Sequence, residues 1–303
     1  MVRMENTEKT KKAKKRKDIR SAVIMVLVMV AMLSAATYAW FSLSSSPTVT
    51  GLEMTAATSG GLKISETGAA NTWYDAIDIS AQNTDTNSKL TPVSVLDSDA
   101  NGVYEAKFYE PVYTGNTVTS LNGTALNANG DSGLGGYVAK YTYYLKSEED
   151  DSVKVGIITA APSTQTGTMG IDGNNQANVP GSFVRKTDSS DTNSAINAVR
   201  IGFVVDGTMY IYEPNYESVT NTGSHADNGL STAPVSNVIS GTDGIITKGN
   251  KTGENYTSIG LFEVNSAGKQ ITMYIWLEGT DDDCVDQIQA DEIEAQIQFT
   301  VVE

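Results

Sequence analysis

Short segments in which apolar and polar residues alternate recur from residue 48 to residue 302. A period of two turns every second side chain to the same side, as in a β-strand with a buried face. The clearest segments are residues 137–146, 153–159, 195–205, 269–278 and 293–302. Long runs rich in Gly, Asn and Thr separate them, and no amphipathic helix of useful length follows residue 41. The sequence therefore predicts an all-β fold, an antiparallel sandwich or jelly roll with long polar loops.

Three pairs of these segments predict antiparallel hairpins. Asp206-Gly207 separates residues 195–205 from residues 208–212. An Asp-Gly pair suits a two-residue hairpin turn, because that turn needs positive φ. The two other expected hairpins join residues 137–146 to 153–159 and residues 258–264 to 269–278.

The N-terminus carries a different signal. Residues 21–41 contain no charged residue, and residues 1–20 are dense in Lys and Arg. About 20 apolar residues can span a bilayer as a helix, whereas a basic flank, a shorter apolar core and small residues at its end form a secretory signal. We favour cleavage, either before Thr37 or between Ala39 and Trp40; the alternative is an uncleaved anchor with its basic end in the cytoplasm. Both alternatives predict an N-terminal hydrophobic helix and an extracellular or cell-surface location for the rest of the chain.

These signals divide the chain into a signal peptide or membrane anchor, residues 1–39, and one extracellular β domain, residues 40–303. The domain carries 12 Lys and Arg against 33 Asp and Glu, a net charge of −21. Such a surface repels nucleic acid and anionic lipid, so we expect no nucleic-acid partner and membrane contact only through residues 21–41. With Cys284 as its one cysteine, the domain has no internal disulfide and must rest on its core and ladders. We expect Cys284 to be a buried thiol rather than a link between chains.

The sequence gives little support for catalysis. The one histidine, His225, is far from Cys284 in sequence, which is a poor starting point for a Cys–His nucleophile pair. No nucleophile elbow, zinc motif or phosphate-binding loop occurs. We therefore predict no enzyme, no catalytic residue and no resident cofactor.

Calcium is the one ligand that a motif suggests. Residues 97–102 read Asp-Ser-Asp-Ala-Asn-Gly, which matches the opening of an oxygen-ligand loop and makes Asp97, Asp99 and Asn101 candidate ligands. The twelfth position is Phe108 instead of a bidentate Glu, and no helices flank the loop. We favour the alternative that these residues form an ordinary turn, with calcium as the weaker reading.

Residues 37–42, Thr-Tyr-Ala-Trp-Phe-Ser, resemble the end of a SipW-type signal peptide, in which Thr, an aromatic residue and Ala precede the cut. Proteins that carry this signal include the TasA/camelysin family of biofilm-matrix fibre subunits. Residues 275–284, Ile-Trp-Leu-Glu-Gly-Thr-Asp-Asp-Asp-Cys, are also similar to a closing motif of surface proteins with such signals. The resemblance implies a jelly-roll domain whose mature N-terminus inserts as an extra strand into the next subunit. It also implies contact with a signal peptidase during export.

The start of the domain suits such a donor strand. Its alternating residues on one face are Thr48, Thr50, Leu52, Met54 and Ala56. A sandwich has sheet edges, and an exposed edge accepts a strand; the alternative is that this segment pairs within its own domain. We therefore predict a secreted structural subunit of an extracellular fibre or biofilm matrix that self-associates into filaments. The alternative is a membrane-anchored surface domain that binds glycan or protein.

Overall fold

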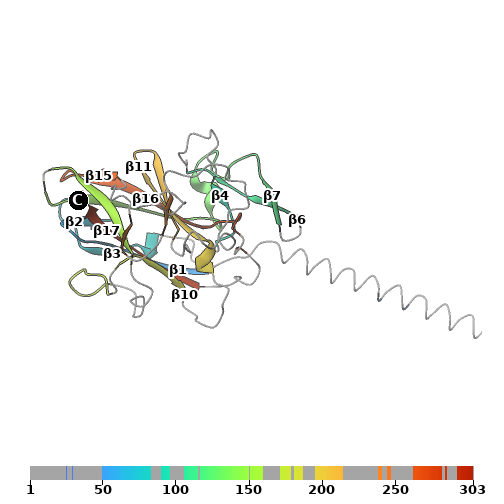
Figure 1. The fold of residues 1–303 in the computed structure, drawn as a ribbon, viewed down its shortest axis with the longest axis horizontal. Coiled ribbons are helices and arrows are strands. Elements are labelled where there is room, and N and C mark those ends of the chain that lie inside the picture. The colour runs from blue at the N-terminus through green and yellow to red at the C-terminus, as the bar shows by residue number, and fades with distance from the viewer. Residues whose placement is uncertain are drawn as a thin grey trace, which may run out of the picture. The chain divides into compact units, whose positions relative to one another are not determined.

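The computed structural model divides by its contacts into two units, Met1–Ser45 and Ser46–Glu303 (Figure 1). It describes Met25, Met29 and residues 50–82, 90–95, 106–114, 117–149, 151–159, 171–178, 181–186, 195–213, 238–240, 244–246, 262–281, 284 and 292–302. Met25 and Met29 are helical and exposed, and the rest of the hydrophobic stretch, with the predicted cleavage residues Ala39 and Trp40, lies outside the described residues. Within the described part of the chain, no helix has the length and apolar character needed to cross a bilayer.

The described part of the second unit is all-β, as the alternation predicts. Its larger sheet has seven strands in the order β14-β9-β17-β1-β3, while β15 also pairs with β9 and β10 with β17. These strands are β1 (Thr50–Thr58), β3 (Ala76–Asp78), β9 (Val153–Thr159), β10 (Phe183–Lys186), β14 (Gly244–Ile246), β15 (Phe262–Val264) and β17 (Glu292–Val302). The pairing in this sheet is antiparallel except between β1 and β17, which run parallel.

The second sheet has six strands in the order β13-β12-β11-β16-β8-β2. They are β2 (Leu62–Ser65), β8 (Ala139–Ser147), β11 (Val199–Val205), β12 (Thr208–Glu213), β13 (Val238–Ser240) and β16 (Lys269–Leu277). Two small pairs complete the described strands: β4 (Ser94–Val95) with β5 (Phe108–Tyr109), and β6 (Pro111–Thr114) with β7 (Thr117–Leu121). The helical elements described in this unit are short: α2 (Ala195–Ala198) and the 3-10 turns η1 (Ser80–Gln82) and η2 (Asp131–Leu134).

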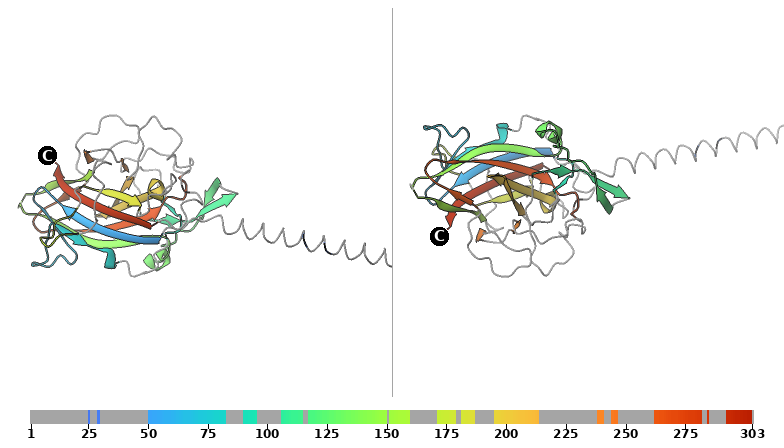
Figure 2. Two further views of the ribbon diagram at one scale, coloured as in Figure 1. Left: turned by 90° about the horizontal axis from the view of Figure 1, so that it is seen from below. Right: turned by 90° about the horizontal axis from the view of Figure 1, so that it is seen from above.

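The two large sheets share one apolar core, which gives the domain a sandwich-like layering (Figure 2). Its side chains come from the alternating positions that the sequence predicts, including Tyr141, Tyr143 and Leu145 of β8, Ile271, Met273 and Ile275 of β16, and Ile293, Ala295, Ile297 and Phe299 of β17. Phe299 lies at an aromatic centre, with its ring 5.5 Å from that of Phe203, 6.0 Å from Tyr143 and 6.4 Å from Phe262. Burial of these side chains is the main favourable term in the stability of the fold.

A second apolar cluster covers the opposite side of the six-stranded sheet. Trp276 and Tyr274 of β16 alternate with the core residues and therefore point away from the sandwich. The ring of Phe108 lies 5.5 Å from Trp276 and 5.3 Å from Tyr274. The other buried members are Val93, Val95, Leu134, Val138, Met209 and Ile211. The middle of this sheet is thus buried on both faces.

One predicted hairpin is confirmed and two are wrong. β11 and β12 pair antiparallel across Asp206 (φ 50°) and Gly207 (φ 82°), as the Asp-Gly signal indicates. By contrast, β8 pairs with β16 and β2, while the strand that follows it, β9, belongs to the other sheet. The segment expected to pair with β16 also lies in the other sheet, as β15. Alternation shows which face of a strand is buried. In a sandwich the strands of both sheets turn one face towards the same core, so alternation does not show to which sheet a strand belongs.

A further prediction is partly wrong. Residues 195–205 were expected to be one strand, but the first four form the single turn α2 and only Val199–Val205 form β11. The burial of Val199, Ile201, Phe203 and Val205 in one phase agrees with the prediction.

Candidate functional site, the first strand and its position in the sheet

The predicted donor segment forms strand β1, which lies inside the seven-stranded sheet. β1 lies between β17 and β3 of the same chain, which is the second of the two alternatives that the sequence left open. Met54 and Ala56 belong to the sandwich core, on the face predicted for them. Thr55 and Ala57, which point the other way, are buried as well. Thr48 and the side chains of residues 50–53 lie outside the described part of the chain.

The pairing with β17 gives β1 its long partner. In register, Thr50 lies opposite Glu292, and Glu53 to Thr58 lie opposite Glu294 to Phe299, with one irregularity between Thr50 and Glu53. The two strands run side by side in the same direction (Figure 2). A parallel ladder forms evenly spaced hydrogen bonds between the main chains. Such a ladder is independent of most side chains, so any strand of suitable shape can form it.

The other edge of β1 has a shorter partner. Only Thr55, Ala56 and Ala57 are in register with β3. At Met54, before these paired residues, the side chain of Ser80 replaces the main-chain pairing. The Met54 amide donates to Ser80 Oγ at 2.8 Å, and Ser80 Oγ lies 3.1 Å from the Met54 carbonyl oxygen. The Ile79 amide also donates to that carbonyl at 3.1 Å. In the sequence, only a serine after a short apolar run marks the position of this contact.

A tight turn fixes the far end of β1. The Thr58 amide donates to the Asp75 carbonyl oxygen at 2.7 Å, and the Ser59 amide to the Phe299 carbonyl oxygen at 2.9 Å. Gly60 (φ 68°) and Gly61 (φ 79°) then carry the chain to β2 in the other sheet. A Cβ on Gly60 would lie 3.2 Å from Thr300 Oγ1, so both the backbone conformation and the space favour glycine.

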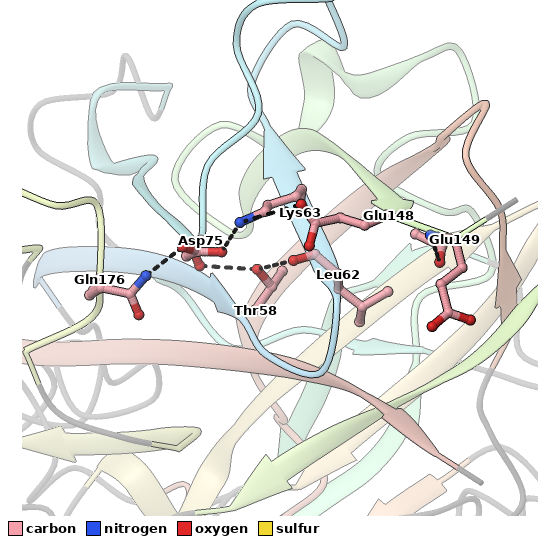
Figure 3. Close-up of polar contacts among 8 residues, drawn as sticks. Thr58, Leu62, Lys63, Asp75, Glu148, Glu149 and Gln176 are labelled. Atoms are coloured by element: carbon pink, nitrogen blue, oxygen red, sulfur yellow. Dashed lines mark hydrogen bonds and ion pairs between the residues drawn. The ribbon is translucent and has the colours of Figure 1, made fainter.

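A polar cluster surrounds this turn (Figure 3). Lys63 Nζ lies 2.6 Å from Asp75 Oδ1 and 3.8 Å from Glu148 Oε1, and Gln176 donates to the other oxygen of Asp75 at 2.5 Å. The hydrogen bond to Asp75 raises the pKa of Lys63, partial burial opposes this, and the charges of Asp75 and Glu148 raise it further. A raised pKa keeps the amine protonated, so the cluster acts as an ion pair that ties β2 to the segment before β3. A protonated amine is a poor nucleophile.

A second polar cluster is buried beside the outer apolar layer, and the sequence did not predict it. Arg200 Nη2 lies 2.5 Å from Asp281 Oδ2, and both side chains are almost fully buried. Nearby, Glu278 accepts hydrogen bonds from Trp276 Nε1 at 3.2 Å and from Thr280 Oγ1 at 2.8 Å. Four of these five residues belong to the 275–284 segment, which thus has a structural role at the end of β16. The available signal was Arg200, a charge within an otherwise apolar strand.

The predicted calcium ligands, Asp97, Asp99 and Asn101, lie outside the described residues, so the calcium site stays a prediction. Among the residues that are described, no group of three or more His, Cys, Asp or Glu side chains is placed to hold a metal ion. The side chain of Cys284 is buried, as expected.

Comparison with known proteins yields no relative. No protein-family model matches the chain, and no curated protein or solved structure is significantly similar to it.

Proposed function

We propose that the chain is a secreted structural subunit that assembles into extracellular fibres or a surface matrix by donation of its N-terminal strand. The observation that carries the proposal is the position of β1. This strand is the first in the described part of the domain, and it is inserted between two strands of the sheet through main-chain pairing. A copy of the same strand from a neighbouring chain offers identical pairing, which is the basis of domain swapping.

A jelly-roll topology is part of this proposal. Two large sheets around one apolar core support it, as does the resemblance of residues 37–42 to the signal peptide of fibre subunits. In this proposal, a donated β1 would complete the larger sheet by forming the parallel ladder with β17 of the receiving subunit.

Electron microscopy of the chain cleaved before Trp40 tests assembly, with the uncleaved chain as the control. We expect filaments from the cleaved form and none from the uncleaved form. A cleaved protein that remains monomeric over a wide concentration range would contradict the proposal. N-terminal sequencing of the secreted protein tests the maturation step, and a start at Met1 would exclude this form of strand donation.

A cysteine pair distinguishes strand donation from other modes of assembly. Ala57 and Gln298 are register partners in the β1–β17 ladder. The variant Ala57→Cys/Gln298→Cys, in a Cys284→Ala background, is oxidised after assembly and run on a non-reducing gel. Strand donation predicts a series of gel bands from covalently linked dimers, trimers and larger species, because each disulfide bond then joins two chains. Oxidised monomers from intact filaments would show that β1 stays in its own domain.

A further inference from the structure

The first and last strands of the domain are arranged so that tension on the chain acts along their ladder. The described domain begins at Thr50 of β1 and ends at Val302 of β17, and these strands run parallel. Thr50 lies beside Glu292, at the start of β17, whereas Thr58 lies beside Phe299, near its end. The two outward-leading ends are therefore at opposite ends of the ladder. A pull on both draws β1 and β17 past each other along their own axes.

This direction of load is the one that a ladder resists best. When two strands are pulled along their axes in opposite directions, the evenly spaced hydrogen bonds of a parallel ladder carry the force together. When two neighbouring ends are pulled apart, the bonds break one after another. The rate of forced unfolding depends on the unfolding barrier rather than on the equilibrium stability. The same contacts therefore withstand very different forces in the two directions.

Other contacts of β17 oppose sliding as well. Its second edge pairs with β9, from Phe299 opposite Ile157 to Val302 opposite Lys154. The ring of Phe299 is held among Phe203, Tyr143 and Phe262. Movement of β17 along its axis must therefore break a second ladder and withdraw a fully buried aromatic side chain.

We propose that the β domain is a tension-bearing element and that the β1–β17 ladder is its mechanical clamp. The inference rests on the proposed function only for the source of the load, which is a tether or a neighbouring subunit on the N-terminal side. If β1 is donated by a neighbouring copy, the same ladder joins the two subunits and carries the tension between them along the axes of the two strands.

Single-molecule force spectroscopy on the full chain in mild detergent tests the clamp. Two pairs of engineered cysteines serve as attachment points, and each pair loads the same ladder in a different direction. The pair Ser46→Cys/Glu303→Cys pulls β1 and β17 along their axes. The matched control, Ser46→Cys/Glu292→Cys, pulls at neighbouring ends, because Glu292 is the register partner of Thr50. Both are made in a Cys284→Ala background; if that background does not fold, Cys284 is retained, because its thiol is buried.

We expect the first pair to unfold at a force at least about twofold higher than the second at the same pulling speed. Equal forces, or a lower force for the first pair, would overturn the clamp. Denaturant unfolding of both variants must give the same midpoint, so that the difference reflects direction alone. The force measurement uses single copies, so it tests the clamp even if the protein does not form filaments. Equal forces would overturn the clamp alone, because filament assembly is tested separately by electron microscopy.

Discussion

Arg200 shows how a single residue can contradict the pattern around it. It lies in a strand whose neighbours are buried apolar side chains, and only 2% of its own surface is exposed. Burying a guanidinium is costly unless an anion and further acceptors accompany it. Asp281 supplies the anion, and the Val199 carbonyl oxygen accepts a second hydrogen bond at 3.1 Å. The acidic run after β16, residues 281–283, thus begins with a structural ion pair.

We expect Asp281→Asn to lower the free energy of unfolding by about 3–5 kcal/mol, because it leaves the Arg200 charge buried without its anion. Urea unfolding followed by circular dichroism measures the change. The double variant Arg200→Met/Asp281→Leu removes both charges and should recover part of the loss. If Asp281→Asn has wild-type stability, the pair does not contribute as described.

Among the elements, the β11–β12 hairpin is the one that local sequence specifies fully. Asp206 and Gly207 both have positive φ, and the strands on either side keep strict register from Val205 opposite Thr208 to Ile201 opposite Tyr212. The left-handed conformation is accessible to glycine without steric cost, whereas a Cβ raises its energy. The turn residues and the register therefore have one local cause.

We expect Gly207→Ala to lower the free energy of unfolding by about 1 kcal/mol, because alanine must adopt a left-handed conformation there. No atom lies within 4 Å of a Cβ at this position, so the cost comes from the backbone alone. The matched control is Gly123→Ala, where the space is equally open and no positive φ is found. Denaturation midpoints compare the two, and equal effects would contradict a backbone origin.

The other strands show what the sequence could not predict. The periods of β8, β9 and β16 correctly indicated strands with one face in the core, but not the sheet to which each belongs. A short turn leads either to a hairpin or to a crossing between sheets, and only Asp-Gly carries a specific signal for the former. The candidate site was half predicted for the same reason: the buried face of Met54 and Ala56 was evident. Their pairing with residues about 240 positions away leaves no local pattern.

At the scale of the whole molecule, buried tyrosines couple stability to alkaline pH. Burial raises the pKa of Tyr143 and of Tyr212, and it raises the pKa of Tyr274 to about 12. In the unfolded chain these phenols titrate near pH 10. Above that pH the unfolded chain binds fewer protons than the folded one, so the free energy of unfolding falls as the pH rises. Below about pH 10 the contribution of these groups is fully present.

We therefore expect the urea midpoint to fall steadily between about pH 10 and pH 12. The variant Tyr143→Phe should fall less steeply, because it has one titrating group fewer; the one hydrogen bond shown for its hydroxyl is to the Met273 sulfur, at 3.9 Å. Midpoints that do not change over this range would contradict the assignment, as would normal titration of all tyrosines by ultraviolet absorbance in the folded protein.

The parallel pairing of β1 with β17 also has a consequence for the order of events during biogenesis. A ribosome releases β1 first and β17 last, so the central ladder of the larger sheet forms only after the whole domain has been synthesised. Contacts between such distant segments also make folding slow. Until β17 arrives, β1 lacks its long neighbour and exposes a strand edge that can capture other chains. The high negative charge opposes such encounters. A chain that can complete its fold only after synthesis of its last strand is also one that can pass through a translocation channel while still unfolded.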